Sequence, residues 1–199
     1  MVSQTGLRAF SVVHRLQSPA GLTRSAALIL VTTARGAGRG SGARYRRAGM
    51  LDRVNDIAIH DAHAAELDAV TLYRILKLRV DVFVVEQNSA YPELDGRDLE
   101  PGARLVWAQR NDDVVGTLRL VDDGDAVRIG RVATAVSARA AGLAGRLMAR
   151  ALELTAKRDT VLDAQTYLRR WYEKFGYAVD GDEFVEDGIA HVPMRRPGQ

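Results

Sequence analysis

Residues 139–144 (Arg-Ala-Ala-Gly-Leu-Ala) combine residue types that suit the binding of an anion. They follow a strand-like run over 127–133 and open an amphipathic helix, so backbone N–H groups would point outward at a helix N-terminus. Gly142 permits backbone conformations that a side chain would forbid, and Arg139 adds a full positive charge. The segment therefore suits a pyrophosphate, although a plain strand-to-helix connection explains the same six residues. A Walker loop is excluded, because no G-K-[ST] is present.

A second candidate for chemistry lies in the aromatic cluster at 171–177. The Tyr172 phenol, with a pKa near ~10, is neutral at pH 7 and can protonate a departing thiolate, whose acid has a pKa near ~8.5. The same cluster is also typical of an aromatic helix face packed in a core. The residues by themselves leave both interpretations open.

The elements around these candidates indicate one compact α/β unit. Hydrophobic periodicity predicts helices and strands in an order that gives a mixed sandwich around a single sheet. The expected strands cover 56–60, 104–109, 114–121, 127–133 and 160–164 and flank the turn 186–188, and the expected helices cover 71–85, 167–175 and the stretch from 143 to 155. A polar loop with several acids is expected at 88–102.

Composition limits the classes of function. The chain has 199 residues and 47% hydrophobic content, enough for one domain with a sizeable core. It contains no cysteine, which excludes disulfides and thiol chemistry, and the pair His60 and His63 lacks a third ligand, so we expect no metal. No apolar run approaches the roughly 20 residues of a membrane span. We expect a cytoplasmic protein with no membrane partner.

Charge divides the chain into two parts. Residues 1–50 hold eight arginines and no lysine or acid, whereas 51–199 hold 20 basic and 25 acidic residues, a net charge of −5. An acidic body argues against a broad nucleic-acid footprint there. The basic segment fits a transit peptide, a secretory signal, a nucleic-acid-binding arm or translated upstream sequence before a start at Met50. We favour the last, and expect 1–49 to be a disordered Arg-rich extension and 50–199 to be the functional domain.

Several blocks together resemble a known family. Residues 127–134, 139–144 and 160–177, in this order, are similar to the acetyl-CoA-binding core of the GCN5-related N-acetyltransferases (GNAT). R-x-x-G-x-A at 139–144 matches the family signature R/Q-x-x-G-x-G/A, and Tyr172 matches the family tyrosine. Gln165 departs from the pattern, in a slot usually held by Asn. Longer blocks resemble the ElaA-like branch, and the resemblance covers about 70–195; these blocks are 78–87, 91–98, 130–132 and 186–194.

The resemblance implies the GNAT acyl-CoA N-acyltransferase fold, a mixed and mostly antiparallel sheet with helices on both faces. It also implies direct transfer of acetyl from acetyl-CoA to an amine. The strand over 132–134 would part from its neighbour and pair with the pantetheine arm, the turn at 139–144 would hold the pyrophosphate, and Tyr172 would be the general acid. The CoA-binding residues implied are Val132, Ala133, Thr134, Arg139, Ala140, Ala141, Gly142, Leu143, Ala144 and Gln165.

The resemblance leaves more than one candidate for the general base and for the residues that contact the acceptor. Glu86 and His191 are candidate bases, directly or through water, whereas a helix-end salt bridge and a structural histidine are the alternatives. Acceptor contacts are expected from Arg79, Asp95 and Asp98, which a solvated charged loop would also explain. The acceptor amine is not identified, and a homodimer is among the assemblies that the resemblance implies. A non-catalytic acyl-CoA-binding module and nucleic-acid binding through the basic arm remain competing functions.

Overall fold

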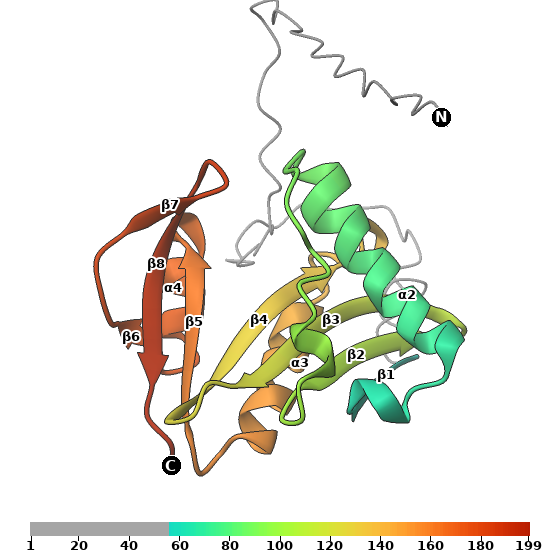
Figure 1. Ribbon diagram of the computed structural model, residues 1–199, viewed down its shortest axis with the longest axis horizontal. Coiled ribbons are helices and arrows are strands. Elements are labelled where there is room, and N and C mark those ends of the chain that lie inside the picture. Colours follow the sequence, from blue (N-terminus) through green and yellow to red (C-terminus); the bar gives the residue numbers. More distant parts are fainter. Residues whose placement is uncertain (1–55) are drawn as a thin grey trace, which may run out of the picture.

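A computed structural model describes residues 56–199, and the expectations for 1–49 and for a start at Met50 lie outside this part. One sheet of eight strands organises it, in the order β1-β2-β3-β4-β5-β8-β6, with β7 paired to β8 (Figure 1). The strands are β1 (Ile57–Ala62), β2 (Arg104–Arg110), β3 (Asp113–Asp122), β4 (Ala126–Thr134), β5 (Asp159–Gln165), β6 (Ala178–Val179), β7 (Phe184–Glu186) and β8 (Ile189–Arg196). The helices are α2 (Ala69–Arg79), the π-helical segment η2 (Val80–Glu86), α3 (Leu143–Leu154) and α4 (Arg169–Glu173).

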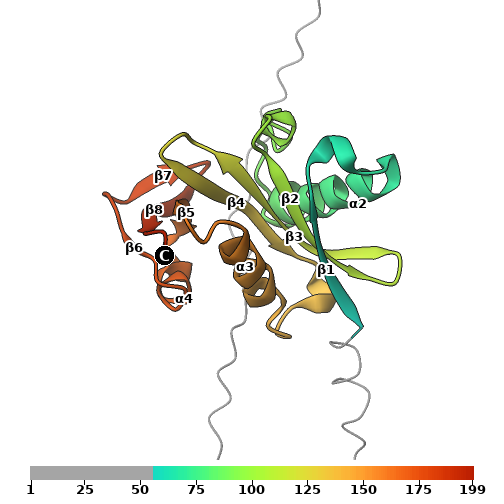
Figure 2. The same cartoon turned by 90° about the horizontal axis from the view of Figure 1, so that it is seen from below.

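Helices cover both faces of this sheet. α2 lies in front of β2, β3 and β4 in Figure 1 and α3 lies behind them, and Figure 2 shows the same two helices from below. Leu143, Leu147 and Met148 of α3 are buried in the main core. A Cβ at Gly116 would lie 3.0 Å from Leu147 Cδ1, so glycine lets this helix approach β3 closely. The expected mixed sheet with helices on both faces is confirmed, and the pairing is antiparallel except between β4 and β5.

The helix expected over 71–85 is correct in place but not in type along its whole length. Asp68 caps α2 by accepting hydrogen bonds from the backbone N–H groups of Val70 and Thr71. The α-helix ends at Arg79 and continues as η2, whose sequence contains four valines. β-branched side chains crowd the α-helical turn, and π-helical segments are frequent at functional sites. β6 was not expected, because two residues carry no readable period.

β4 and β5 pair only at one end. Their parallel pairing joins Ala126–Arg128 to 159–161, and beyond these residues the two strands run without pairing to each other. On its other side β4 carries a bulge opposite β3, at Arg131, whose φ of 56° is left-handed. Such a bulge bends its strand and increases the local twist. The expectation that the strand over 132–134 parts from its neighbour is confirmed.

Candidate active site

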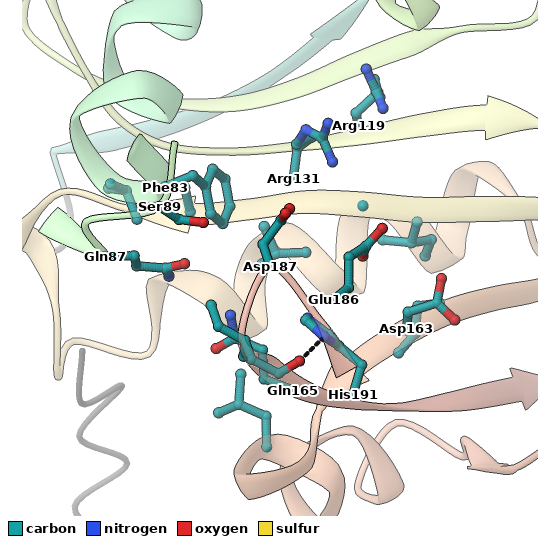
Figure 3. Close-up of a pocket in the computed structure, with 18 of the residues that line it drawn as sticks. Phe83, Gln87, Ser89, Arg119, Arg131, Asp163, Gln165, Glu186, Asp187 and His191 are labelled. Atoms are coloured by element: carbon teal, nitrogen blue, oxygen red, sulfur yellow. Dashed lines mark hydrogen bonds between the residues drawn. The ribbon is translucent and has the colours of Figure 1, made fainter. Parts of the chain in front are cut away.

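A cavity of about 470 Å³ lies where β4 and β5 part (Figure 3). Its walls come from η2, the loop that follows η2, β3, β4, β5, the segment 167–172 that includes part of α4, and the β7–β8 hairpin. In Figure 3 Glu186, Asp187 and His191 of the hairpin face Arg119 and Arg131 of β3 and β4. The cavity therefore joins segments that are about a hundred residues apart in the sequence.

Five of the expected CoA-binding residues line this cavity. The edge of β4 that faces β5 has no ladder partner there, so its backbone groups are placed to pair with an extended ligand. Thr134 O already accepts a hydrogen bond from Arg139 Nε at 3.2 Å. The five residues are Val132, Ala133, Thr134, Arg139 and Gln165.

The turn at 139–144 forms a helix N-terminus beside the cavity. The first helical bond runs from Arg146 N–H to Gly142 O at 3.2 Å, so the N–H groups of residues 143–145 have no acceptor within the helix. Gly142 has φ 72° and Ala140 has φ 62°. The left-handed conformation costs an alanine about 1–2 kcal/mol, a strain that is frequent at functional sites. Only Arg139 of this turn lines the cavity, and the side chain of Leu143 is buried in the core.

Arg139 and Glu86 form a bidentate ion pair. Arg139 Nη1 donates to Glu86 Oε1 at 2.7 Å and Nη2 donates to Oε2 at 2.6 Å. The hydrogen bonds from Arg139 hold the pKa of Glu86 below its usual value, so its carboxylate is a weaker base. Glu86 does not line the cavity, whereas Gln87 does. Glu86 is therefore less suited than His191 to accept a proton from an amine.

Tyr172 is buried and lines the cavity from α4. Its ring packs edge-on against Trp171 and Tyr177, with centroid distances of 4.8 and 6.0 Å. Burial raises the pKa of Tyr172, so its hydroxyl stays protonated over the physiological range. The two interpretations of the aromatic cluster are thus not exclusive, because the ring belongs to the core and also borders the cavity.

His191 lines the cavity from β8, opposite Gln165 of β5 in the strand register. Its ring stacks on Phe184 at 5.7 Å, and its Nδ1 lies 2.9 Å from the carbonyl oxygen of Ile189. Because a carbonyl only accepts, Nδ1 carries the proton in this contact, which leaves Nε2 with a lone pair in the neutral ring. Gln165 Oε1 accepts a hydrogen bond from the Tyr167 hydroxyl at 2.6 Å. His191 thus has the tautomer that a base requires.

Three arginines and three acids form a network that lies partly in one wall of the cavity and partly behind it. Arg79 Nε donates to Glu93 Oε1 at 2.5 Å and its Nη1 donates to Asp98 Oδ1 at 2.6 Å. Arg119 holds Asp95 through two bonds of 2.6 and 2.8 Å. Arg131 Nη2 also donates to Asp95, at 3.0 Å. The hydrogen bonds from Arg119 hold the pKa of Asp95 well below its usual range.

This network changes the expected acceptor site. Arg79 has no exposed side-chain surface, and neither it nor Asp98 lines the cavity, so both fix the loop after η2 rather than face a ligand. Of the three expected residues, Asp95 alone lines the cavity. The expectation that Arg79 and Asp98 contact the acceptor is therefore not supported, because neither side chain reaches the cavity.

Six charged residues of the cavity wall were not identified as site residues from the sequence: Arg119, Arg128, Arg131, Asp163, Glu186 and Asp187. Arg119 had a usable signal, since a single charge inside the apolar strand run 114–121 indicates a buried ion pair. Nothing local distinguished Arg131 from other strand residues, because the bulge that displaces it arises from pairing with β3. Glu186 and Asp187 stand in a hairpin turn, where acids are common.

Residues 56–199 contain no group of three His, Cys, Asp or Glu side chains arranged to hold a metal ion. In the same part of the chain, no helix is long and apolar enough to cross a membrane.

Comparison with known proteins gives consistent matches. The family model described as "Acetyltransferase (GNAT) domain" matches residues 73–197. The UPF0039 protein Rv2851c of Mycobacterium tuberculosis is 49% identical over 146 residues, which cover 71% of this chain and 94% of the relative. The crystal structure of Escherichia coli ElaA has a TM-score of 0.67 at 35% identity, covering 70% of this chain and 99% of ElaA. An acyl-CoA N-acyltransferase from Pseudomonas aeruginosa also has a TM-score of 0.67, at 36% identity, with the same coverage of 70% and 99%.

Proposed function

Because the chain belongs to the GNAT acetyltransferase family, we propose that it transfers an acetyl group from acetyl-CoA directly to an amine. The observation that carries this proposal is the parting of β4 and β5 around a cavity that Tyr172 and His191 both line. A strand edge, a protonated phenol and a histidine thus border one space, and a helix N-terminus lies beside it. Acyl transfer between a thioester and an amine needs these kinds of group.

The donor side is built to receive a long polar ligand. Acetyl-CoA supplies a thioester whose carbonyl carbon is open to attack by an amine. The unpaired edge of β4 over 132–134 is suited to hydrogen-bond the pantetheine amides. The N–H groups at the start of α3 are suited to the pyrophosphate, with the helix dipole favouring its negative charge. In this proposal Ala140, Ala141, Gly142, Leu143 and Ala144 contribute backbone rather than side-chain contacts.

Tyr172 is proposed to donate its proton toward the sulfur of the leaving group. Its raised pKa makes complete loss of the proton costly, since the tyrosinate would be buried. The phenol is therefore best suited to stabilise developing charge on the sulfur by a hydrogen bond, with full transfer only as the C–S bond breaks. This hydrogen bond would stabilise the transition state more than the bound substrate, and interactions of that kind raise kcat.

His191 is proposed as the base. The attacking nitrogen forms a bond to the acetyl carbon, the C–S bond breaks, and the nitrogen gives up one proton, for which Nε2 of His191 is the available acceptor. Glu86 is disfavoured in this role because both of its carboxylate oxygens are held by Arg139. Asp95 is kept as part of the acceptor wall, where its charge is already matched by Arg119 and Arg131.

The proposal is tested with the full chain. Calorimetry should detect acetyl-CoA binding, and a screen of amines, peptides and aminoglycosides should give CoA release that depends on one class of acceptor. Absence of acetyl-CoA binding would contradict the proposal. Binding without turnover on any acceptor would instead favour a non-catalytic acyl-CoA-binding module on the same fold.

A further inference from the structure

We propose that Glu186 selects acceptors that carry a second cationic group besides the amine that reacts. The inference rests on the proposed acetyl transfer and concerns the acceptor end of the same cavity. It assigns to Glu186 a role in specificity and names the substrate class as diamines and polyamines, as opposed to simple monoamines.

The strand register places Glu186 beside the proposed base. In the β7–β8 hairpin, Phe184 lies opposite His191 and Glu186 lies opposite Ile189. Alternate residues of a strand share one face, so Glu186, Ile189 and His191 lie on the same face of the hairpin, and all three line the cavity. Diagonal neighbours across such a pair have Cα atoms about 7–8 Å apart. The backbone of Glu186 therefore lies about 7–8 Å from that of His191, the residue proposed to deprotonate the amine.

The charges of the cavity wall favour a cation at this position. Each arginine that lines the cavity is already bound by a carboxylate of the chain; these arginines are Arg119, Arg128, Arg131 and Arg139. Asp95 and Asp163 are likewise held by arginines. Within residues 56–199, Glu186 and Asp187 are the lining acids for which no ion pair forms. The charge left unmatched in the wall is thus negative and lies next to His191.

In a diamine acceptor, the ammonium group that does not react is the one best suited to pair with Glu186. One amine must be neutral when it attacks, so it enters the reaction without a full charge for a carboxylate to pair with. A second ammonium group keeps its charge throughout the reaction and can pair with Glu186, with Asp187 adding to the negative potential. The spacing between the two groups would be set by the distance between Glu186 and His191.

The experiment compares 1,4-diaminobutane with butylamine, which have the same carbon chain and differ in the second amine. With the full-length wild type, kcat/KM should favour the diamine by about tenfold, and the preference should fall as salt is raised. Glu186→Gln should reduce this preference to about twofold or less. Glu183→Gln is the matched control, because Glu183 precedes the same hairpin, is exposed and does not line the cavity, and this variant should keep the preference.

The other outcomes would contradict either the role of Glu186 or the acetyl transfer on which it rests. Equal use of the two amines by the wild type, or a preference that survives Glu186→Gln, would contradict the role of Glu186 and leave acetyl transfer intact. A loss of preference in both variants would mean that the general charge of the hairpin acts, and would overturn the assignment to Glu186. Absence of turnover with any amine, despite acetyl-CoA binding, would defeat the proposed function itself.

Discussion

Arg139 donates hydrogen bonds to both carboxylate oxygens of Glu86. Arg139 begins the turn before α3, and Glu86 is the last residue of η2. The pair joins the turn proposed to hold the donor to η2, which supplies part of the cavity wall. It also gives each residue a partner that a ligand would have to replace. Both consequences can be measured.

Replacing Glu86 by Gln should strengthen CoA binding by about threefold, because the pyrophosphate then no longer competes with a carboxylate for Arg139. The gain is small because a partly exposed ion pair contributes less than about 1 kcal/mol. Calorimetry with CoA measures the change. In an Arg139→Gln background the same substitution should have no effect on CoA affinity, as a double-mutant cycle would show. A fall in kcat of a hundredfold in Glu86→Gln would instead identify Glu86 as the base.

Replacing Tyr172 by Phe should lower kcat by at least about a hundredfold and leave CoA affinity nearly unchanged, because only the donated proton is lost while the ring still fills its place in the core. Steady-state kinetics and calorimetry on the same preparation separate the two effects. Tyr177→Phe is the matched control. Its hydroxyl bonds Thr160 Oγ1 at 2.7 Å and it does not line the cavity, so this variant should lose stability but keep kcat. Equal activity of the two variants would refute the role of Tyr172.

Replacing His191 by Gln should lower kcat by about a hundredfold, because the amine loses its proton acceptor. His63 offers a close comparison, since its Nδ1 also contacts a backbone carbonyl, that of Ala103, at 2.7 Å, yet it does not line the cavity. His63→Gln should therefore retain activity. Rates for both variants are best measured with an acceptor found in the amine screen. If His191→Gln kept full activity, the base would have to be sought elsewhere, through water.

Replacing Asp95 by Asn should lower the free energy of unfolding at pH 7 by about 2 kcal/mol, because the buried Arg119 would lose its bidentate carboxylate and keep only the longer contact to Asp98, at 3.4 Å. The folded-state pKa of Asp95 is depressed by Arg119, so its contribution is present above the ordinary value of 3.8 and is lost as pH falls through the folded value. The difference between wild type and variant should therefore shrink below about pH 4.

Denaturant unfolding at several pH values tests the prediction for Asp95. Asp81→Asn is its control, since the Lys77–Asp81 pair is solvent-exposed and its loss should cost less than about 1 kcal/mol. A difference between Asp95→Asn and wild type that stayed constant down to pH 2 would show that the charge of Asp95 is not responsible.

Much of the fold was predictable because it depends on local signals. The nearly continuous apolar run in 114–121 reflects a strand buried on both faces, and the spacing of Leu143 and Leu147 reflects the buried face of a helix, so neighbouring residues encode both directly. The π-helical form of η2 was not predictable from periodicity alone, since its valines fit an α-helical or a strand pattern equally well. Strand β6 was not predicted for a similar reason, because two residues are too few to show a hydrophobic pattern.

The sequence alone determined the kinds of group available and their order along the chain: a small-residue turn before a helix, a tyrosine downstream of it, and the blocks that resemble one family. The tertiary structure decided which charges meet. Glu86 pairs with Arg139 and not with Arg79, and Arg79 is buried against Glu93 and Asp98. With 28 basic and 25 acidic residues, the sequence allows very many ion pairs of similar local plausibility. Strand register, the bulge at Arg131 and the parting of β4 from β5 select among them, because ion pairing acts through distance in space and not along the chain.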